Sequence, residues 1–168
     1  QEPVDIPLIE TKILDDVLKL DYGFEIYSLL TKWNPLKSEG YLPKEFNNYK
    51  ILIVGMGPAG FTLSHYLANE GFTVVGIDGL KIEPIQSEFS GIMQDGSRAN
   101  FKPIKNISEI EERLSERKAY GFGGVAEYGI TVRWNKNYLT ILRLMLERRE
   151  NFKMYGGIRF GSIINYKS

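Results

Sequence analysis

The sequence predicts an α/β fold, and three features of residues 50–78 support this prediction. An apolar run, Lys50–Val54, leads directly into residues 55–60, which carry glycines at the spacing G-x-G-x-x-G. An amphipathic stretch follows, and then a second apolar run, Thr73–Ile77. This run ends on Asp78, 18 residues after the last glycine of the turn. A strand, a glycine turn, a helix, a strand and an acidic residue in this order are typical of a βαβ unit that binds a dinucleotide.

Each residue of the glycine turn has an expected task. Gly55 permits the tight turn, Gly57 lets the backbone approach a pyrophosphate, and Gly60 lets the helix pack close to the sheet. Pro58 suits the first helical turn, where its missing N–H costs nothing. The helix N-terminus would face the phosphates, and Asp78 would accept hydrogen bonds from ribose hydroxyls. The alternative is a glycine-rich turn in some other α/β unit.

Composition limits the classes of function. The chain has 168 residues, of which 43% are hydrophobic and 25% charged, as expected for a globular domain. Lys+Arg and Asp+Glu both number 21, so no electrostatic attraction to nucleic acid or to an anionic membrane is expected. There is no cysteine, which excludes disulfides and cysteine-ligated iron–sulfur clusters within the chain. No long apolar run and no secretory signal are visible, and a cytoplasmic location is expected.

The N-terminal part predicts a helical segment followed by a linker. Residues 8–32 carry apolar side chains at helical spacing, with a break expected near Tyr22-Gly23. Residues 34–49 contain prolines, a glycine and an Asn-Asn pair and predict a loop. The sequence is therefore divided into residues 1–49 and a domain over residues 50–168.

Beyond the βαβ unit the pattern is weaker. Gly71 is expected to end the first long helix as a C-cap. A further helix is expected to begin near Ser108, because Ser108-Glu109-Ile110-Glu111 matches a capping box. Another helix is expected over about 136–149, with Arg148 and Arg149 near the negative end of its dipole, and a closing strand over Phe152–Phe160.

A second glycine-rich segment occupies residues 121–130 and reads Gly-Phe-Gly-Gly-Val-Ala-Glu-Tyr-Gly-Ile. Such backbone either comes close to another group or adopts positive φ. One interpretation is a wall of the cofactor pocket, and the other is a mobile surface loop. Tyr128 and Ile130 favour the first, because flexible linkers usually avoid such residues.

These two motifs together resemble the FAD-binding domain of the glutamate synthase small-subunit type, a group of flavoproteins with two dinucleotide-binding domains. The resemblance covers V-G-M-G-P-A-G and the later G-G-V-x-x-Y-G-I. It implies an α/β, Rossmann-like FAD-binding domain that is incomplete, with a short helical N-terminal segment and an insertion at about 79–120. The implied FAD-binding residues are Gly55, Gly57, Pro58, Ala59, Gly60, Asp78, Gly123, Gly124, Val125, Tyr128, Gly129 and Ile130.

The chain also departs from that family. The family usually has Glu where Asp78 stands, and Pro where Thr131 follows the Y-G-I segment. The gap over residues 79–120 is longer than usual. The family's nicotinamide-binding domain is absent, and so is the cysteine-rich region that ligates iron–sulfur clusters in many relatives.

The resemblance implies the FAD-binding portion of a flavin-dependent NAD(P)H oxidoreductase, with electrons passing through the flavin. NAD(P)H would bind only through the remainder of the polypeptide or a partner subunit, so the isolated chain is expected to be inactive. The alternative is a non-catalytic module that binds NAD or FAD. No catalytic residue is nominated, and no metal site is expected because the chain has one histidine, His65, for which a structural role is expected.

Overall fold

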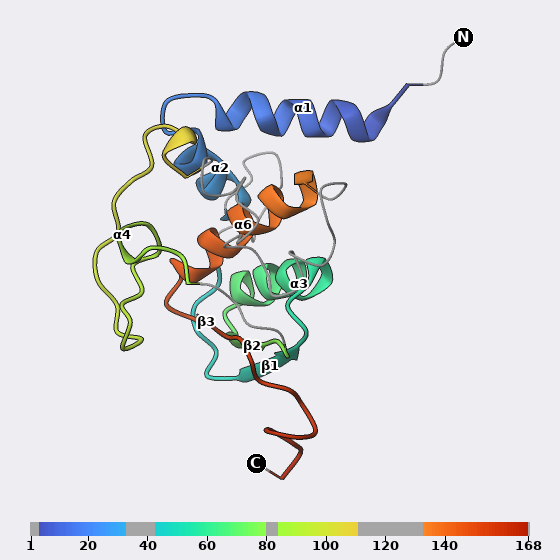
Figure 1. The fold of residues 1–168 in the computed structure, drawn as a ribbon, viewed down its shortest axis with the longest axis vertical. Helices are drawn as coiled ribbons and strands as arrows, with labels where there is room; N and C mark the ends of the chain where they lie inside the picture. The colour runs from blue at the N-terminus through green and yellow to red at the C-terminus, as the bar shows by residue number, and fades with distance from the viewer. Residues whose placement is uncertain (1–3, 33–42, 80–83, 111–132, 168) are drawn as a thin grey trace.

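The computed structural model describes residues 4–32, 43–79, 84–110 and 133–167. It shows a mixed α/β fold with a small parallel sheet (Figure 1). The elements in chain order are α1 (Ile6–Leu18), α2 (Gly23–Lys32), β1 (Lys50–Val54), α3 (Pro58–Asn69), β2 (Thr73–Ile77), α4 (Ser87–Ser90), α6 (Arg133–Glu147) and β3 (Phe152–Tyr155).

The three strands lie in the order β1-β2-β3, and both pairs are parallel. Ile51 of β1 pairs with Val74 of β2, which pairs in turn with Phe152 of β3. Parallel neighbours bring the carboxyl ends of all three strands to one edge of the sheet. Ligands of open α/β sheets bind at this kind of edge.

Helices α3 and α6 lie on the same side of the sheet (Figure 1). Helix α3 packs against β1, β2 and α6, and α6 packs against β3. Ile53 faces α3, so strand alternation places Leu52 and Val54 on the opposite face. Leu52 and Val54 remain 45% and 55% exposed, and Tyr155 of β3 is 47% exposed.

Large side chains from the sheet, the helices and the 84–110 segment form one core. Strand β2 and the inward-facing Ile53 of β1 are buried in this core, whereas most of β1 stays partly or fully exposed. The fully buried members of the core include Phe24, Met56, Phe61, Val74, Ile104, Leu144, Met145, Leu146 and Phe152.

The predicted helix and strand boundaries hold to different degrees. Tyr22 has φ 59°, which breaks α1 from α2 where the sequence predicted it. Gly71 has φ 86° and follows the end of α3, as expected for a C-cap. The predicted strand over Phe152–Phe160 is wrong in length, because β3 stops at Tyr155 and Gly157 turns the chain with φ 72°.

The predicted capping box lies two residues too far along the chain. The Asn106 side chain accepts a hydrogen bond from the Ser108 N–H at 3.0 Å, and the Glu109 carboxylate accepts one from the Asn106 N–H at 2.9 Å. Residues 108–110 are helical, as expected, and these two hydrogen bonds make Asn106 the N-cap of that helical turn. Asn serves in place of Ser because both side chains offer a short oxygen acceptor.

Arg148 directly follows the last residue of α6, near the helix end as the sequence predicted, and its side chain also contacts distant segments. Its guanidinium forms an ion pair with Glu25 of α2 at 2.8 Å. It also donates to the carbonyl oxygens of Phe89 and Lys102, at 2.7 and 3.1 Å, and lies 4.2 Å from the ring centroid of Phe101. Arg148 therefore joins α2 and the 84–102 segment to the C-terminal end of α6.

The Arg98 side chain binds main-chain carbonyl oxygens at and after the C-terminal end of α6. Its guanidinium donates to the carbonyl oxygens of Glu147, Arg149 and Phe152 at 2.8, 2.6 and 2.9 Å. The contact to Glu147 pairs a backbone oxygen that the end of α6 leaves without an intrahelical partner, and the other two pair oxygens after α6, up to the first residue of β3. These contacts also fix the path of the chain between α6 and β3.

Candidate functional site

The glycine turn follows β1 at the carboxyl edge of the sheet. Gly55 has φ 97°, a conformation that residues with a side chain rarely adopt. Its N–H donates to the Ile77 carbonyl oxygen at 2.8 Å, which ties the turn to the end of β2. Gly55 is therefore required by the backbone geometry of the turn.

Gly60 is required by packing. A Cβ added at Gly60 would overlap the carbonyl oxygen of Gly55 and lie 3.6 Å from the Ile53 side chain. The first turn of α3 thus crosses directly over the preceding turn. Any larger residue here would push α3 away from β1.

Gly57 has neither of these reasons to be glycine. Its φ of −87° and ψ of −167° are open to residues with side chains, and a Cβ placed on it would meet no atom of the described residues within 4 Å. The described part of the chain therefore leaves the space outside Gly57 open. A ligand that approaches the backbone closely is a physical reason for glycine at such a position.

Gly57 is also the N-cap of α3, with Pro58 in the first turn. It offers no side chain to the N–H groups of that turn, which include those of Ala59 and Gly60. Anions are stabilised at such a helix end by the N–H groups and by the positive end of the helix dipole.

Asp78 lies next to the turn, directly after β2. One of its carboxylate oxygens accepts a hydrogen bond from the Met56 N–H at 2.9 Å. Its own N–H donates to Tyr155 and its carbonyl oxygen accepts from the Ile158 N–H, at 3.0 and 2.9 Å.

The structure thus brings together the glycine turn, the start of α3 and Asp78. The other six predicted residues, Gly123, Gly124, Val125, Tyr128, Gly129 and Ile130, lie outside the described residues. The sequence reasoning missed the roles of Met56 and Ile158. Both act through main-chain N–H groups, so their side-chain identities carry no signal for this role.

His65 connects α3 to α2 rather than facing the turn. Its Nε2 atom lies 3.2 Å from the Thr31 carbonyl oxygen and 3.3 Å from the Asn69 amide nitrogen. Burial, and then the nearby Arg149 charge, lower the pKa of His65. This position fits the structural role that the sequence predicted.

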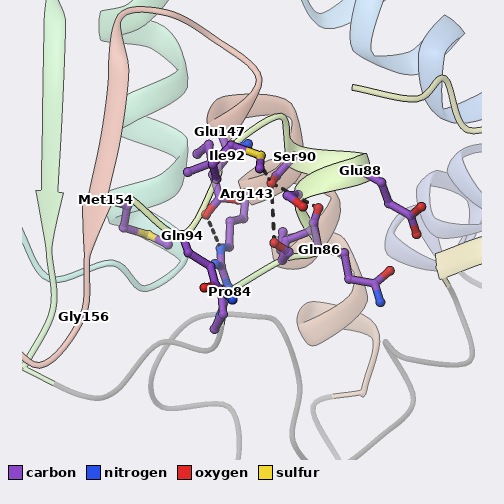
Figure 2. A pocket seen from close by; sticks show the side chains of 13 residues that line it. Pro84, Gln86, Glu88, Ser90, Ile92, Gln94, Arg143, Glu147, Met154 and Gly156 are labelled. Atoms are coloured by element: carbon purple, nitrogen blue, oxygen red, sulfur yellow. Dashed lines mark hydrogen bonds and ion pairs between the residues drawn. The ribbon is translucent and has the colours of Figure 1, made fainter. Parts of the chain in front are cut away.

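A separate cavity of about 960 Å³ lies between the 84–94 segment, α6 and the end of β3 (Figure 2). Its lining includes Gly156 but none of the glycine-turn residues and not Asp78. Arg143 and Glu147 of α6 form an ion pair in it at 2.8 Å, with side chains only 3% and 8% exposed. The Arg143 and Glu147 charges compensate each other, and Glu88 also lines the cavity.

The described residues contain neither a candidate metal site nor a candidate membrane-spanning helix. Across residues 4–32, 43–79, 84–110 and 133–167, no cluster of three or more His, Asp or Glu side chains could hold a metal ion. Within the same ranges, no helix has the length and apolar character needed to cross a membrane.

The chain has a similar counterpart in Rickettsia prowazekii (strain Madrid E), a protein named uncharacterized protein RP006. The two are 55% identical over 161 residues, which make up 96% of this chain and 21% of that protein. This chain therefore spans about a fifth of the length of this curated relative. No known family profile matches the chain, and no solved structure does.

Proposed function

We propose that the chain is the FAD-binding portion of a flavin-dependent NAD(P)H oxidoreductase, built as a Rossmann-like domain of the glutamate synthase small-subunit type. The observation that carries the proposal is Gly57. The fold accounts for Gly55 by its positive φ and for Gly60 by its packing, but it does not account for Gly57. A phosphate group against the backbone would account for it.

The surrounding geometry supports a dinucleotide in one orientation. The pyrophosphate would lie at Gly57 and the first turn of α3. Asp78, fixed by the Met56 N–H, would accept hydrogen bonds from the adenosine ribose. FAD is favoured over NAD by the resemblance of residues 121–130 to the flavin side of the family's pocket.

When bound, the flavin supplies the redox chemistry, because it accepts a hydride and passes the electrons on. The chain's own residues bind and orient the cofactor. NAD(P)H binding is assigned to the remainder of a longer polypeptide or to a partner subunit. Two observations support this division: the relative is much longer than this chain, and the sheet face with Leu52 and Val54 exposes apolar side chains.

The proposal is tested by FAD binding to the purified chain and to two glycine variants. Wild type is expected to bind FAD, measured by calorimetry and by flavin absorbance. Gly57→Ala is expected to fold normally, because the added methyl group would contact none of the described residues. It is expected to weaken FAD binding about 100-fold or more, the equivalent of two charge-assisted hydrogen bonds.

Gly96→Ala is the matched control. Gly96 also has open space around its Cβ position but lies in the turn after Ile92. Its φ of 78° predicts a modest loss of stability for Gly96→Ala with FAD affinity unchanged. Wild-type affinity for FAD in Gly57→Ala, or no FAD binding by the wild-type chain, would refute the proposed function.

A further inference from the structure

After β3 the chain turns back across the end of β2. Gly157, with φ 72°, makes this turn, and the Ile158 N–H then donates to the carbonyl oxygen of Asp78 at 2.9 Å. The following residues close into a compact turn, in which the Ile163 N–H donates to the Arg159 carbonyl oxygen at 3.0 Å. Figure 1 shows this C-terminal segment curling beyond the strands. The turn holds the backbone of Arg159 beside the proposed ribose site.

The Arg159 side chain lies against Gly79, the residue directly after Asp78. A Cβ built on Gly79 would be 3.8 Å from Arg159 Nε and 4.0 Å from Arg159 Cβ. Arg159 itself is exposed. Among the described residues its guanidinium has no hydrogen bond and no ion pair. A cationic planar group thus lies against Gly79, the chain neighbour of Asp78, with no partner of its own among the described residues.

We infer that Arg159 recognises the adenine base of the bound dinucleotide by stacking its guanidinium on the ring. The inference rests on the proposed function. If Asp78 holds the ribose, the base extends past Asp78 toward its chain neighbour Gly79, which presents no side chain. Guanidinium groups stack readily on aromatic faces.

The other use of an arginine at this place is to bind a 2′-phosphate, as in sites for NADP(H). Asp78 argues against it. Its carboxylate is fixed by the Met56 N–H at 2.9 Å, so it would lie close to the 2′ position and repel a phosphate. The site is therefore expected to prefer adenosine with a free 2′-hydroxyl.

The test measures ADP, 2′,5′-ADP, FAD and FMN binding by calorimetry on the full chain. Wild type is expected to bind ADP more tightly than 2′,5′-ADP. Arg159→Ala is expected to weaken both ADP and FAD about 3- to 10-fold, with FMN affinity unchanged. Arg159→Lys keeps the charge without the planar group and is expected to recover only part of the loss. Lys153→Ala, which removes an exposed cation from β3, is the matched control and is expected to leave all four affinities unchanged.

The outcomes separate this inference from the proposed function. If wild type binds FAD but Arg159→Ala binds ADP as tightly as wild type, the adenine contact is wrong and the FAD assignment stands. Tighter binding of 2′,5′-ADP than of ADP, lost in Arg159→Ala, would assign the guanidinium to a phosphate and overturn the stacking. A wild-type chain that binds neither FAD nor ADP would overturn both.

Discussion

Asp78 is predicted to serve two functions that can be separated by substitution. Its carboxylate accepts a hydrogen bond from the Met56 N–H at 2.9 Å, which holds the glycine turn. In the proposed complex it also accepts hydrogen bonds from the adenosine ribose. Asp78→Ala removes both contacts. A hydrogen bond to a charged group contributes about 1.5–3 kcal/mol. We therefore expect the free energy of unfolding to fall by about 1.5 kcal/mol, the lower end, because Asp78 is only half-buried and water can replace the carboxylate.

Asp78→Ala is also expected to weaken FAD binding, and this effect is separate from the loss of stability. Loss of the ribose contact, at about 1.5–3 kcal/mol, raises the dissociation constant for FAD about 10- to 150-fold. Asp78→Asn keeps one oxygen acceptor for the Met56 N–H but loses the charge. It should retain most of the stability while weakening FAD about tenfold.

Urea denaturation measures the first effect and calorimetry the second. Asp95→Ala is the control, because the Asp95 carboxylate also accepts a main-chain N–H bond at 2.9 Å, from Ser97, but in a fully exposed turn. It should change neither stability nor FAD affinity appreciably. The reasoning fails if Asp78→Ala binds FAD like wild type, or if the Ala and Asn variants lose the same stability.

Three further predictions concern stability and activity. Arg148→Met should lower the free energy of unfolding, measured by urea denaturation, by about 2–4 kcal/mol. This is less than for a fully buried ion pair, because Glu25 is partly exposed. The double variant with Glu25→Gln should lose less stability than the sum of the two single variants, and additive losses would argue against coupling of the two side chains. The pKa of His65 is lowered in the folded state by burial, so the unfolded chain binds the proton more readily and stability should fall as pH drops below the unfolded value of about 6.5. His65→Gln should reduce this dependence of the melting temperature on pH, and an unchanged dependence would contradict it. Residues 1–168 with FAD bound should not oxidise NADH or NADPH in a steady-state assay, and turnover at rates usual for flavoenzymes would refute the assignment of NAD(P)H binding to another domain.

The sequence predicted the parts of the fold that depend on local physics. The strands Lys50–Val54 and Thr73–Ile77 follow from apolar runs bounded by turn residues, and the end of α3 follows from the conformation that Gly71 adopts. Contacts between distant segments could not be predicted in this way. Nothing in the sequence around Arg148 indicates that its guanidinium pairs with Glu25, 123 residues away.

The same distinction applies to the candidate site. The spacing of its glycines predicted the turn, but the spacing treats Gly55, Gly57 and Gly60 alike. The structure separates them, because backbone geometry requires Gly55 and packing requires Gly60 whether or not a ligand binds. A glycine turn in some other α/β unit would need those two glycines and would tolerate a side chain at Gly57. The choice between the two interpretations of the motif therefore depends on this one residue, where a methyl group should leave the fold intact and remove the dinucleotide.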